Sequence, residues 1–228
     1  MELKAEGVSR RYMRKTGEAN YFDAVREISL TLEGGRIIGL TGRSGSGKTT
    51  LLHMMAGLLR PTEGRVLLDG ADLYAMEDRA LSRLRSRCFG VIPQGRSAVD
   101  SLTVLENILL PGALSGRGNA SDAAREKAGA LMAELGIEAL ADAWPGELSG
   151  GELRRMAIAR ALTHGPDFIL ADEPTGDLDD ENTARVLMLL RRAAEEGAGV
   201  LLVTHESGAL TIADEVWRMD AGSVKPAQ

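Results

Sequence analysis

The chain has 228 residues, the size of one domain or of one domain with a subdomain, so a long tandem array is excluded. Its 44% hydrophobic and 26% charged residues are typical of a globular protein and exclude a disordered chain. The formal net charge of −6 argues against a general electrostatic grip on nucleic acid or on an anionic lipid surface, so we expect no nucleic-acid partner.

No segment of the sequence is expected to cross a membrane. The longest apolar runs, such as residues 200–203, fall far short of the roughly 20 residues that a membrane-spanning helix needs. Residues 1–4 show no basic segment followed by an apolar one, so we expect a soluble chain that is not exported on its own. Cys88 is the only cysteine, which excludes an internal disulfide.

Two strands are predicted early in the chain, at residues 25–32 and 36–40, with Gly34 and Gly35 between them. A glycine-rich loop follows the second strand, and apolar residues at helical spacing continue from it as far as Pro61. The loop has the G-x-x-x-x-G-K-[ST] pattern of a phosphate-binding loop. Its residues are Gly42, Arg43, Ser44, Gly45, Ser46, Gly47, Lys48, Thr49 and Thr50.

The residue types of this loop fit an anion cradle. Glycines let backbone N–H groups turn inward around an anion, and the following helix adds about half a positive charge at its N-terminus. Lys48 is then placed to reach the β- and γ-phosphates of a nucleotide, and the Thr49 hydroxyl to bind Mg²⁺. A flexible Gly/Ser turn is disfavoured because the loop lies between a strand and a helix.

The middle of the chain is predicted to be mostly helical. Residues 111–119, which are rich in Gly and Ser, are predicted to form a surface loop. Residues 121–135 have the pattern of an amphipathic helix that ends at Gly136. Neither segment is assigned any chemistry.

A second candidate anion site lies at residues 148–152, which begin a helix that is predicted to end at Gly165 and Pro166. Ser149, Gly150 and Gly151 would place free N–H groups at the positive end of this helix. A mononucleotide has only one γ-phosphate, so we infer that the second site serves a nucleotide held by another molecule. The alternative is that Ser149 only caps the helix.

Two carboxylates follow a continuously apolar run, residues 168–171, that is typical of a buried parallel strand. Carboxylates at the end of a buried strand are costly without a cation or a polar pocket. Beside a phosphate loop, Asp172 is predicted to hold Mg²⁺ and Glu173 to accept a proton from an attacking water as general base. A solvated acidic turn is the alternative interpretation.

The last predicted strand, residues 199–203, is followed by His205. Ligands of open α/β sheets bind at the carboxyl ends of the strands. A lone histidine is more often structural, but a position that matches that of Asp172 and Glu173 on another strand favours a functional role.

Together these motifs resemble the nucleotide-binding subunit of an ABC transporter over essentially the whole chain. In that family's terms, Walker A is residues 42–49, Walker B is residues 168–172 followed by the catalytic Glu173, and the signature is residues 148–152, which includes Glu152. The resemblance implies ATP and Mg²⁺ as cofactors and His205 as the histidine that contacts the γ-phosphate. It also implies that Gln94 is a ligand of Mg²⁺ and water, that Asp177 belongs to the D-loop, and that Tyr12 stacks on adenine.

The resemblance further implies an α/β fold. An ABC-type P-loop NTPase core, with a mixed sheet and an antiparallel β-subdomain, would comprise residues 1–94 and 165–228. An inserted α-helical subdomain, residues 95–164, would carry the signature.

The same resemblance implies two kinds of partner. A head-to-tail homodimer would close the signature helix of one subunit over ATP on the Walker A of the other. One or more membrane-spanning permease subunits would hold the chain at the cytoplasmic face of the cell membrane. Residues 171–179 are similar to those of the lipoprotein-release and macrolide-export group, which also includes a cell-division ATPase, whereas Pro93 and Gly95 beside Gln94 depart from that group's usual residues.

Export or extraction is therefore the expected function, and a mechanical signalling ATPase that moves no solute is the alternative. A soluble ABC ATPase of DNA repair, chromosome organisation or translation generally needs a coiled-coil insertion, zinc cysteines or a second cassette. A kinase or small GTPase would leave the signature at residues 148–152 unexplained.

Overall fold

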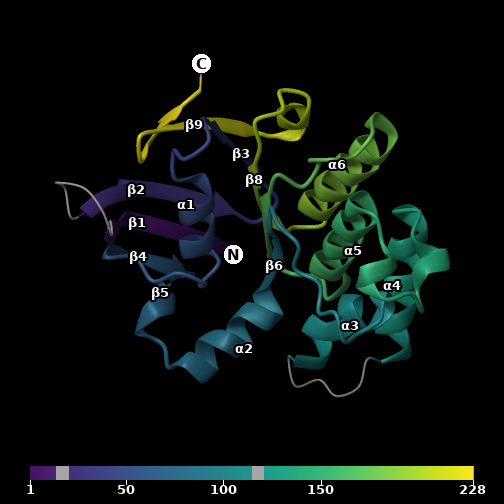
Figure 1. Cartoon of the computed structure of the whole chain (residues 1–228). Coiled ribbons are helices and arrows are strands. Elements are labelled where there is room, and N and C mark those ends of the chain that lie inside the picture. Colours follow the sequence, from purple (N-terminus) through teal and green to yellow (C-terminus); the bar gives the residue numbers. More distant parts are fainter. Residues whose placement is uncertain (14–20, 115–120, 228) are drawn as a thin grey trace.

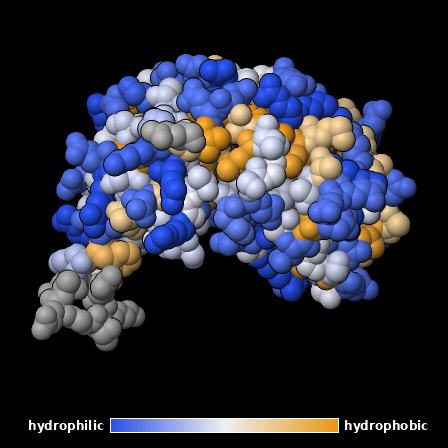
Figure 2. Space-filling view, turned by 90° about the horizontal axis from the view of Figure 1, so that it is seen from above, coloured by the Kyte–Doolittle hydropathy of each residue, from blue (hydrophilic) through white to orange (hydrophobic). Residues whose placement is uncertain are grey.

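The computed structural model describes residues 1–13, 21–114 and 121–227. These residues form two β-sheets, with a group of helices on the far side of the second sheet from the first (Figure 1). From above, the molecule presents a largely hydrophilic face with hydrophobic residues near its centre, and its outline is hollowed between two lobes (Figure 2).

The first sheet is antiparallel and contains the N-terminal strands. Its strand order among the described residues is β2-β1-β4-β5, with β1 at Glu2–Met13, β2 at Tyr21–Glu33, β4 at Glu63–Leu68 and β5 at Ala71–Asp72. Leu3 and Ala5 of β1 are fully buried and pair with Leu32 and Leu30 of β2. Because side chains alternate along a strand, this register buries one face of the sheet.

The second sheet is mixed. Its order is β10-β9-β3-β8-β7-β6, with β3 at Ile37–Gly42, β6 at Phe89–Ile92, β7 at Phe168–Asp172, β8 at Gly199–Val203, β9 at Glu215–Asp220 and β10 at Ser223–Pro226. Only the β9–β10 pair is antiparallel within this described sheet. The carboxyl ends of β3, β6, β7 and β8 therefore lie at the same edge.

Six α-helices occur in the described residues: α1 at Lys48–Met55, α2 at Asp78–Cys88, α3 at Val104–Leu114, α4 at Asp122–Glu134, α5 at Gly150–Thr163 and α6 at Asp180–Glu195. Short 3-10 helices lie at Leu73–Ala75, Glu138–Leu140, Pro145–Glu147 and Ala209–Ile212. Figure 1 shows α3, α4, α5 and α6 grouped to the right of the second sheet, whereas α1 lies between the two sheets. No helix of the described residues combines the length and the apolar character that crossing a bilayer requires.

Two hydrophobic cores cover the two faces of the second sheet. Leu170 and Leu201 pack into the core shared with α1 and the antiparallel sheet, whereas Ile169 and Leu202 pack into the core shared with α3, α4, α5 and α6. Every residue of β7 and β8 is buried, as the continuous apolar runs predicted. The α/β fold with a mixed sheet, an antiparallel sheet and a helical part is therefore confirmed.

Two sequence predictions differ from the structure. The helix after the phosphate loop ends at Met55 rather than continuing to Pro61. The surface loop predicted at residues 111–119 is wrong for residues 111–114, which extend α3, while residues 115–119 lie outside the described part of the chain. Pro111 lacks a backbone N–H, but the buried Val104 and Ile108 anchor α3 in the core, and this packing outweighs the local cost of the proline.

Candidate functional site

The phosphate loop joins the end of β3 to the start of α1, and its glycines are required by geometry. Gly47 is the N-cap of α1 and has a φ of 108°. A Cβ atom on Gly47 would lie 2.1 Å from the backbone oxygen of Ala24, and one on Gly42 would lie 2.2 Å from that of Met219. Only glycine fits at these two positions, so the close approach of neighbouring backbone shapes the loop.

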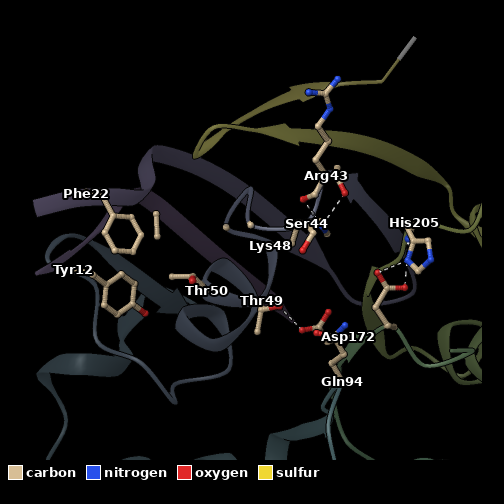
Figure 3. Close-up of a pocket in the computed structure, with 15 residues that line it drawn as sticks. Tyr12, Phe22, Arg43, Ser44, Lys48, Thr49, Thr50, Gln94, Asp172 and His205 are labelled. Atoms are coloured by element: carbon tan, nitrogen blue, oxygen red, sulfur yellow. Dashed lines mark hydrogen bonds and ion pairs between the residues drawn. The ribbon is translucent and has the colours of Figure 1, made fainter. Parts of the chain in front are cut away.

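Lys48 is held above this loop by the loop's own backbone. Its Nζ donates hydrogen bonds to the backbone oxygens of Gly42 at 2.8 Å and Arg43 at 3.0 Å. The ammonium group thus lies at the mouth of the loop, where an anion would find it already placed. The Arg43 side chain extends away from the cavity (Figure 3).

Thr49 and Asp172 meet although 123 residues separate them in the sequence. The Thr49 hydroxyl donates to Oδ2 of Asp172 at 2.6 Å, and Asp172 is only 2% exposed. Burial raises the pKa of Asp172, the hydrogen bond from Thr49 opposes that rise, and the neighbouring charge of Glu173 adds to it. A buried carboxylate with a raised pKa gains from a nearby cation.

These two oxygens fit Mg²⁺ rather than a metal with many protein ligands. Mg²⁺ prefers hard oxygen donors and is commonly held by one or two protein groups together with substrate phosphates. The described residues contain no group of three or more His, Cys, Asp or Glu side chains arranged to hold a metal ion. A carboxylate beside a hydroxyl, next to a phosphate loop, is therefore a fitting donor set for Mg²⁺.

Glu173 and His205 form a second polar pair at the same sheet edge. Nδ1 of His205 lies 2.8 Å from Oε1 of Glu173, and the glutamate side chain is 10% exposed against 71% for the histidine. The hydrogen bond to Glu173, and then its negative charge, raise the pKa of His205. Glu173 has a φ of 51°, a left-handed conformation that is costly for a residue other than glycine, and backbone strain of this kind clusters at active sites.

One cavity of about 650 Å³ brings most of these groups together (Figure 3). Its walls include the phosphate loop, Gln94, Asp172, Glu173 and His205, and Tyr12 lies at its other end. Of the loop, the lining includes Gly42, Arg43, Ser44, Gly45, Gly47, Lys48, Thr49 and Thr50, whereas Ser46 is not part of it. The hydroxyl of Ser46 is buried, with no hydrogen-bond partner among the described residues.

Phe22 also lines the cavity, although no sequence motif assigns it a role. Its ring stacks on that of Tyr12 with centroids 5.6 Å apart, and Arg10 lies over the same tyrosine ring at 4.9 Å. Tyr12 and Phe22 are paired neighbours of β1 and β2. Two aromatic residues close together in the sequence were the available signal, but the register that stacks them is visible only in the sheet.

The second candidate anion site lies away from this cavity. Ser149 is the N-cap of α5, and its Oγ accepts a hydrogen bond from the N–H of Glu152 at 3.3 Å. Oε2 of Glu152 in turn accepts from the backbone N–H of Ser149 at 2.7 Å and from its hydroxyl at 2.6 Å. The capping role that the sequence left open for Ser149 is therefore present, as a complete capping box.

A smaller cavity of about 170 Å³ lies beside the start of α5. Gly150, Arg154, Asp177 and Gln94 line it, so Gln94 borders both cavities. Within one chain, Ser149, Gly150, Gly151, Glu152 and Asp177 are thus separated from the wall formed by the phosphate loop.

Comparisons with known protein families and sequences agree with this geometry. The model of the ABC transporter family matches residues 25–176. The lipoprotein-releasing system ATP-binding protein of Chromohalobacter salexigens is 38% identical over 221 residues, which cover 96% of this chain and 91% of that protein. The methionine import ATP-binding protein of Cereibacter sphaeroides is 44% identical over 206 residues, 90% of this chain and 58% of that protein. The macrolide export ATP-binding/permease protein of Syntrophobacter fumaroxidans is 37% identical over 217 residues, 94% of this chain and 30% of that protein.

Solved structures extend the likeness to three dimensions. A bacterial ABC transporter cassette solved as a dimer superposes with a TM-score of 0.91 and 34% identity, covering 98% of this chain and 96% of that one. A post-hydrolysis state of that cassette, dimeric and bound to ADP and Pi, has a TM-score of 0.92 and 33% identity, covering 99% and 98%.

Proposed function

This chain belongs to the ABC transporter family and is one of its ATP-binding, ATP-hydrolysing subunits; from that premise we propose that it powers export or extraction of a substrate through a separate membrane-spanning partner. The observation that carries the proposal is the 650 Å³ cavity, which collects phosphate-loop, carboxylate and histidine groups while the start of α5 remains outside it.

The phosphate loop is the proposed site of the ATP phosphates. Lys48 lies over its mouth and would move from the Gly42 and Arg43 carbonyls toward phosphate oxygens, which are stronger acceptors because they are charged. The dipole of α1 adds fixed positive potential at its N-terminus, where negative charge spreads over the phosphoryl group during its transfer to water. Tyr12, stacked on Phe22, offers an aromatic surface for the base.

Thr49, Asp172 and Gln94 are the proposed holders of Mg²⁺. The Thr49 hydroxyl and Asp172 carboxylate already lie 2.6 Å apart, and Gln94 borders the same cavity. Mg²⁺, when bound, neutralises negative charge on the β- and γ-phosphate oxygens.

Glu173 is the proposed general base. Its carboxylate is nearly buried and is held by the ring of His205, which fixes the direction in which it can accept a proton from water. His205 is mostly exposed and carries a raised pKa, so it is suited to contact the γ-phosphate from the open side of the cavity.

The completed site is proposed to require a second copy of the chain. Ser149, Gly150 and Gly151 are not part of the Walker A cavity, and a start of α5 supplied by another subunit would cover the exposed side of bound ATP. Closure with ATP and reopening after hydrolysis would then drive the membrane partner.

The chain is proposed to consist of two units, a core of residues 1–94 and 165–228 and a helical subdomain of residues 95–164. The permease is proposed to hold the chain at the cytoplasmic face of the membrane.

Replacing the general base tests this function. Glu173→Gln keeps the size and hydrogen-bonding shape of the side chain, so it should retain ATP binding while turnover falls about 10²-fold or more. Light scattering of this variant with excess ATP should give the mass of a dimer. Near-normal hydrolysis would contradict the role of Glu173, and a monomer even with the membrane partner present would contradict the proposed function.

Vesicles that contain the permease separate transport from mechanical signalling. ATP-dependent movement of a substrate is the expected result. ATPase activity that the partner stimulates without any substrate movement would instead support a signalling ATPase.

A further inference from the structure

The segment that carries Gln94 is held by arginines of α5. Residues 93–98 follow β6 and have no regular secondary structure. Arg154 donates from Nη1 to the backbone oxygen of Pro93 at 2.8 Å and from Nη2 to that of Gln94 at 2.6 Å. Farther along the same helix, Arg160 donates from Nη1 to the backbone oxygen of Ser97 at 2.7 Å.

The contact with Arg154 is geometrically specific. Its guanidinium is a planar fork, and it binds two consecutive carbonyl oxygens with its two terminal nitrogens. Both bonds are charge-assisted, and the arginine is part-buried where it meets Pro93. Lysine would keep the charge, but a single Nζ would have to reach both oxygens in place of the two terminal nitrogens of the guanidinium.

The residues on either side of Gln94, Pro93 and Gly95, make the position of Gln94 depend on the hydrogen bonds from Arg154. Pro93 restricts its own backbone rotation because its ring fixes φ. A Cβ atom on Gly95 would meet no heavy atom within 4 Å, so no packed neighbour restrains the chain at Gly95 itself. The two bonds from Arg154 are therefore the side-chain contacts that hold the backbone at Pro93 and Gln94.

Helix α5 connects this contact to the start of the signature. Ser149 caps the helix, and Arg154 lies five residues later, about 7.5 Å along the helix axis. A helix moves as a rigid rod over this distance, because each turn is hydrogen-bonded to the next. A shift of the Ser149 end would therefore carry Arg154 and its bonds to Pro93 and Gln94 with it.

We propose that Arg154 is a positioning residue that makes the placement of Gln94 depend on α5 and so links the two nucleotide sites of a dimer. This inference rests on the proposed function. The start of α5 would contact ATP held by the partner subunit, while Gln94 of the same chain serves its own ATP. Arg154 connects the two sites because it lies on α5 and donates hydrogen bonds to the backbone of the segment that carries Gln94.

A double-mutant cycle with Gln94 tests the inference. Arg154→Met removes the donors while keeping an unbranched side chain, and we expect turnover to fall about tenfold with single-site nucleotide affinity unchanged. In a Gln94→Ala background the same replacement should have no further effect, because Arg154 acts through Gln94. Effects that multiply, or wild-type turnover in Arg154→Met, would overturn the inference.

Cooperativity provides a readout that a merely structural role would not change. The Hill coefficient for ATP should exceed 1 in the wild type and fall toward 1 in Arg154→Met. Arg154→Lys should fold normally and show an intermediate turnover. A wild-type Hill coefficient of 1, or no change on replacing Arg154, would overturn the link between the sites.

Arg185→Met is the matched control. Arg185 also joins two helices, contacting the backbone oxygen of Glu134 at 3.4 Å and the carboxylate of Glu181, but it lies away from both cavities. The Arg185→Met variant should keep the wild-type Hill coefficient. If Glu173→Gln dimerises with ATP while Arg154→Met behaves like the wild type, only this inference fails and the proposed function stands.

Discussion

The two glycine-rich helix starts of this molecule use similar residues in opposite ways. Helix α1 begins after Gly47, whose φ of 108° is left-handed, and no side chain caps it. Helix α5 begins after Ser149, whose backbone is extended, and a capping box satisfies the N–H groups of Ser149 and Glu152. The first start opens into the 650 Å³ cavity, and the second does not.

The two helix starts differ in the hydrogen bonds that must break before an anion can bind. At α1 the N–H groups are held ready by glycines that no other residue can replace, so binding requires little rearrangement. At α5 a phosphate would compete with the Glu152 carboxylate for the N–H and the hydroxyl of Ser149. We therefore expect α1 to bind nucleotide alone and α5 to contribute only when the nucleotide is already held nearby.

The largest expected effect is on nucleotide affinity, which replacing Lys48 should lower and replacing Ser149 should not. Lys48→Ala removes a charged donor at the loop mouth, and nucleotide affinity of the isolated chain should fall at least about 100-fold. Ser149→Ala should leave that affinity unchanged while lowering turnover of the dimer. Titration with a fluorescent ATP analogue checks both variants, and equal losses of affinity would break the contrast between the two helix starts.

Glycine replacement tests the geometry of the same two starts. A Cβ on Gly47 would lie 2.1 Å from a backbone oxygen at a positive φ, so Gly47→Ala should destabilise the fold by about 2 kcal/mol or more. Gly150 has nothing within 4 Å of an added Cβ, so Gly150→Ala should be neutral or stabilising by up to about 1 kcal/mol. Urea unfolding measures both, and a Gly47→Ala chain as stable as the wild type would contradict the model of the loop.

The smallest expected effect concerns the carboxylates beside the two starts. Burial raises the pKa of Asp172, so its charged form costs stability above its folded pKa, and Asp172→Asn should raise the Tm of the nucleotide-free chain at pH 7. Hydrogen bonds from Ser149 lower the pKa of Glu152, so that group stabilises above its unfolded pKa, and Glu152→Gln should slightly lower the Tm.

Both changes in Tm should vanish at acid pH, but over different pH ranges. The gain from Asp172→Asn disappears as the pH falls from the raised pKa of Asp172 through its unfolded value. The loss from Glu152→Gln disappears as the pH falls through the lowered pKa of Glu152. Thermal unfolding from pH 7 downward measures both, and a lower Tm for Asp172→Asn at pH 7 would contradict the assigned cost of burial.

The sequence predicted the parts of the site that are local in the chain. The phosphate loop and the strand-end position of Asp172 could be found because their residue types and spacing serve a chemistry that few other patterns serve. The α5 cap could be seen only as one of two alternatives, since Ser149 followed three residues later by Glu152 fits both a cap and an anion site. The extension of α3 past Pro111 was missed because core packing, not local propensity, decided it.

Amino-acid order alone thus determined which groups we propose for the nucleotide site, because a glycine loop, a buried strand and a helix start are each specified by a few neighbouring residues. Tertiary structure decided which of them meet. Thr49 reaches Asp172, His205 reaches Glu173, and Arg154 grips Gln94 only because β3, β8, β7 and β6 lie in that order and α5 packs beside them. Contacts between residues 32 to 123 positions apart depend on sheet order and register, which no short segment encodes.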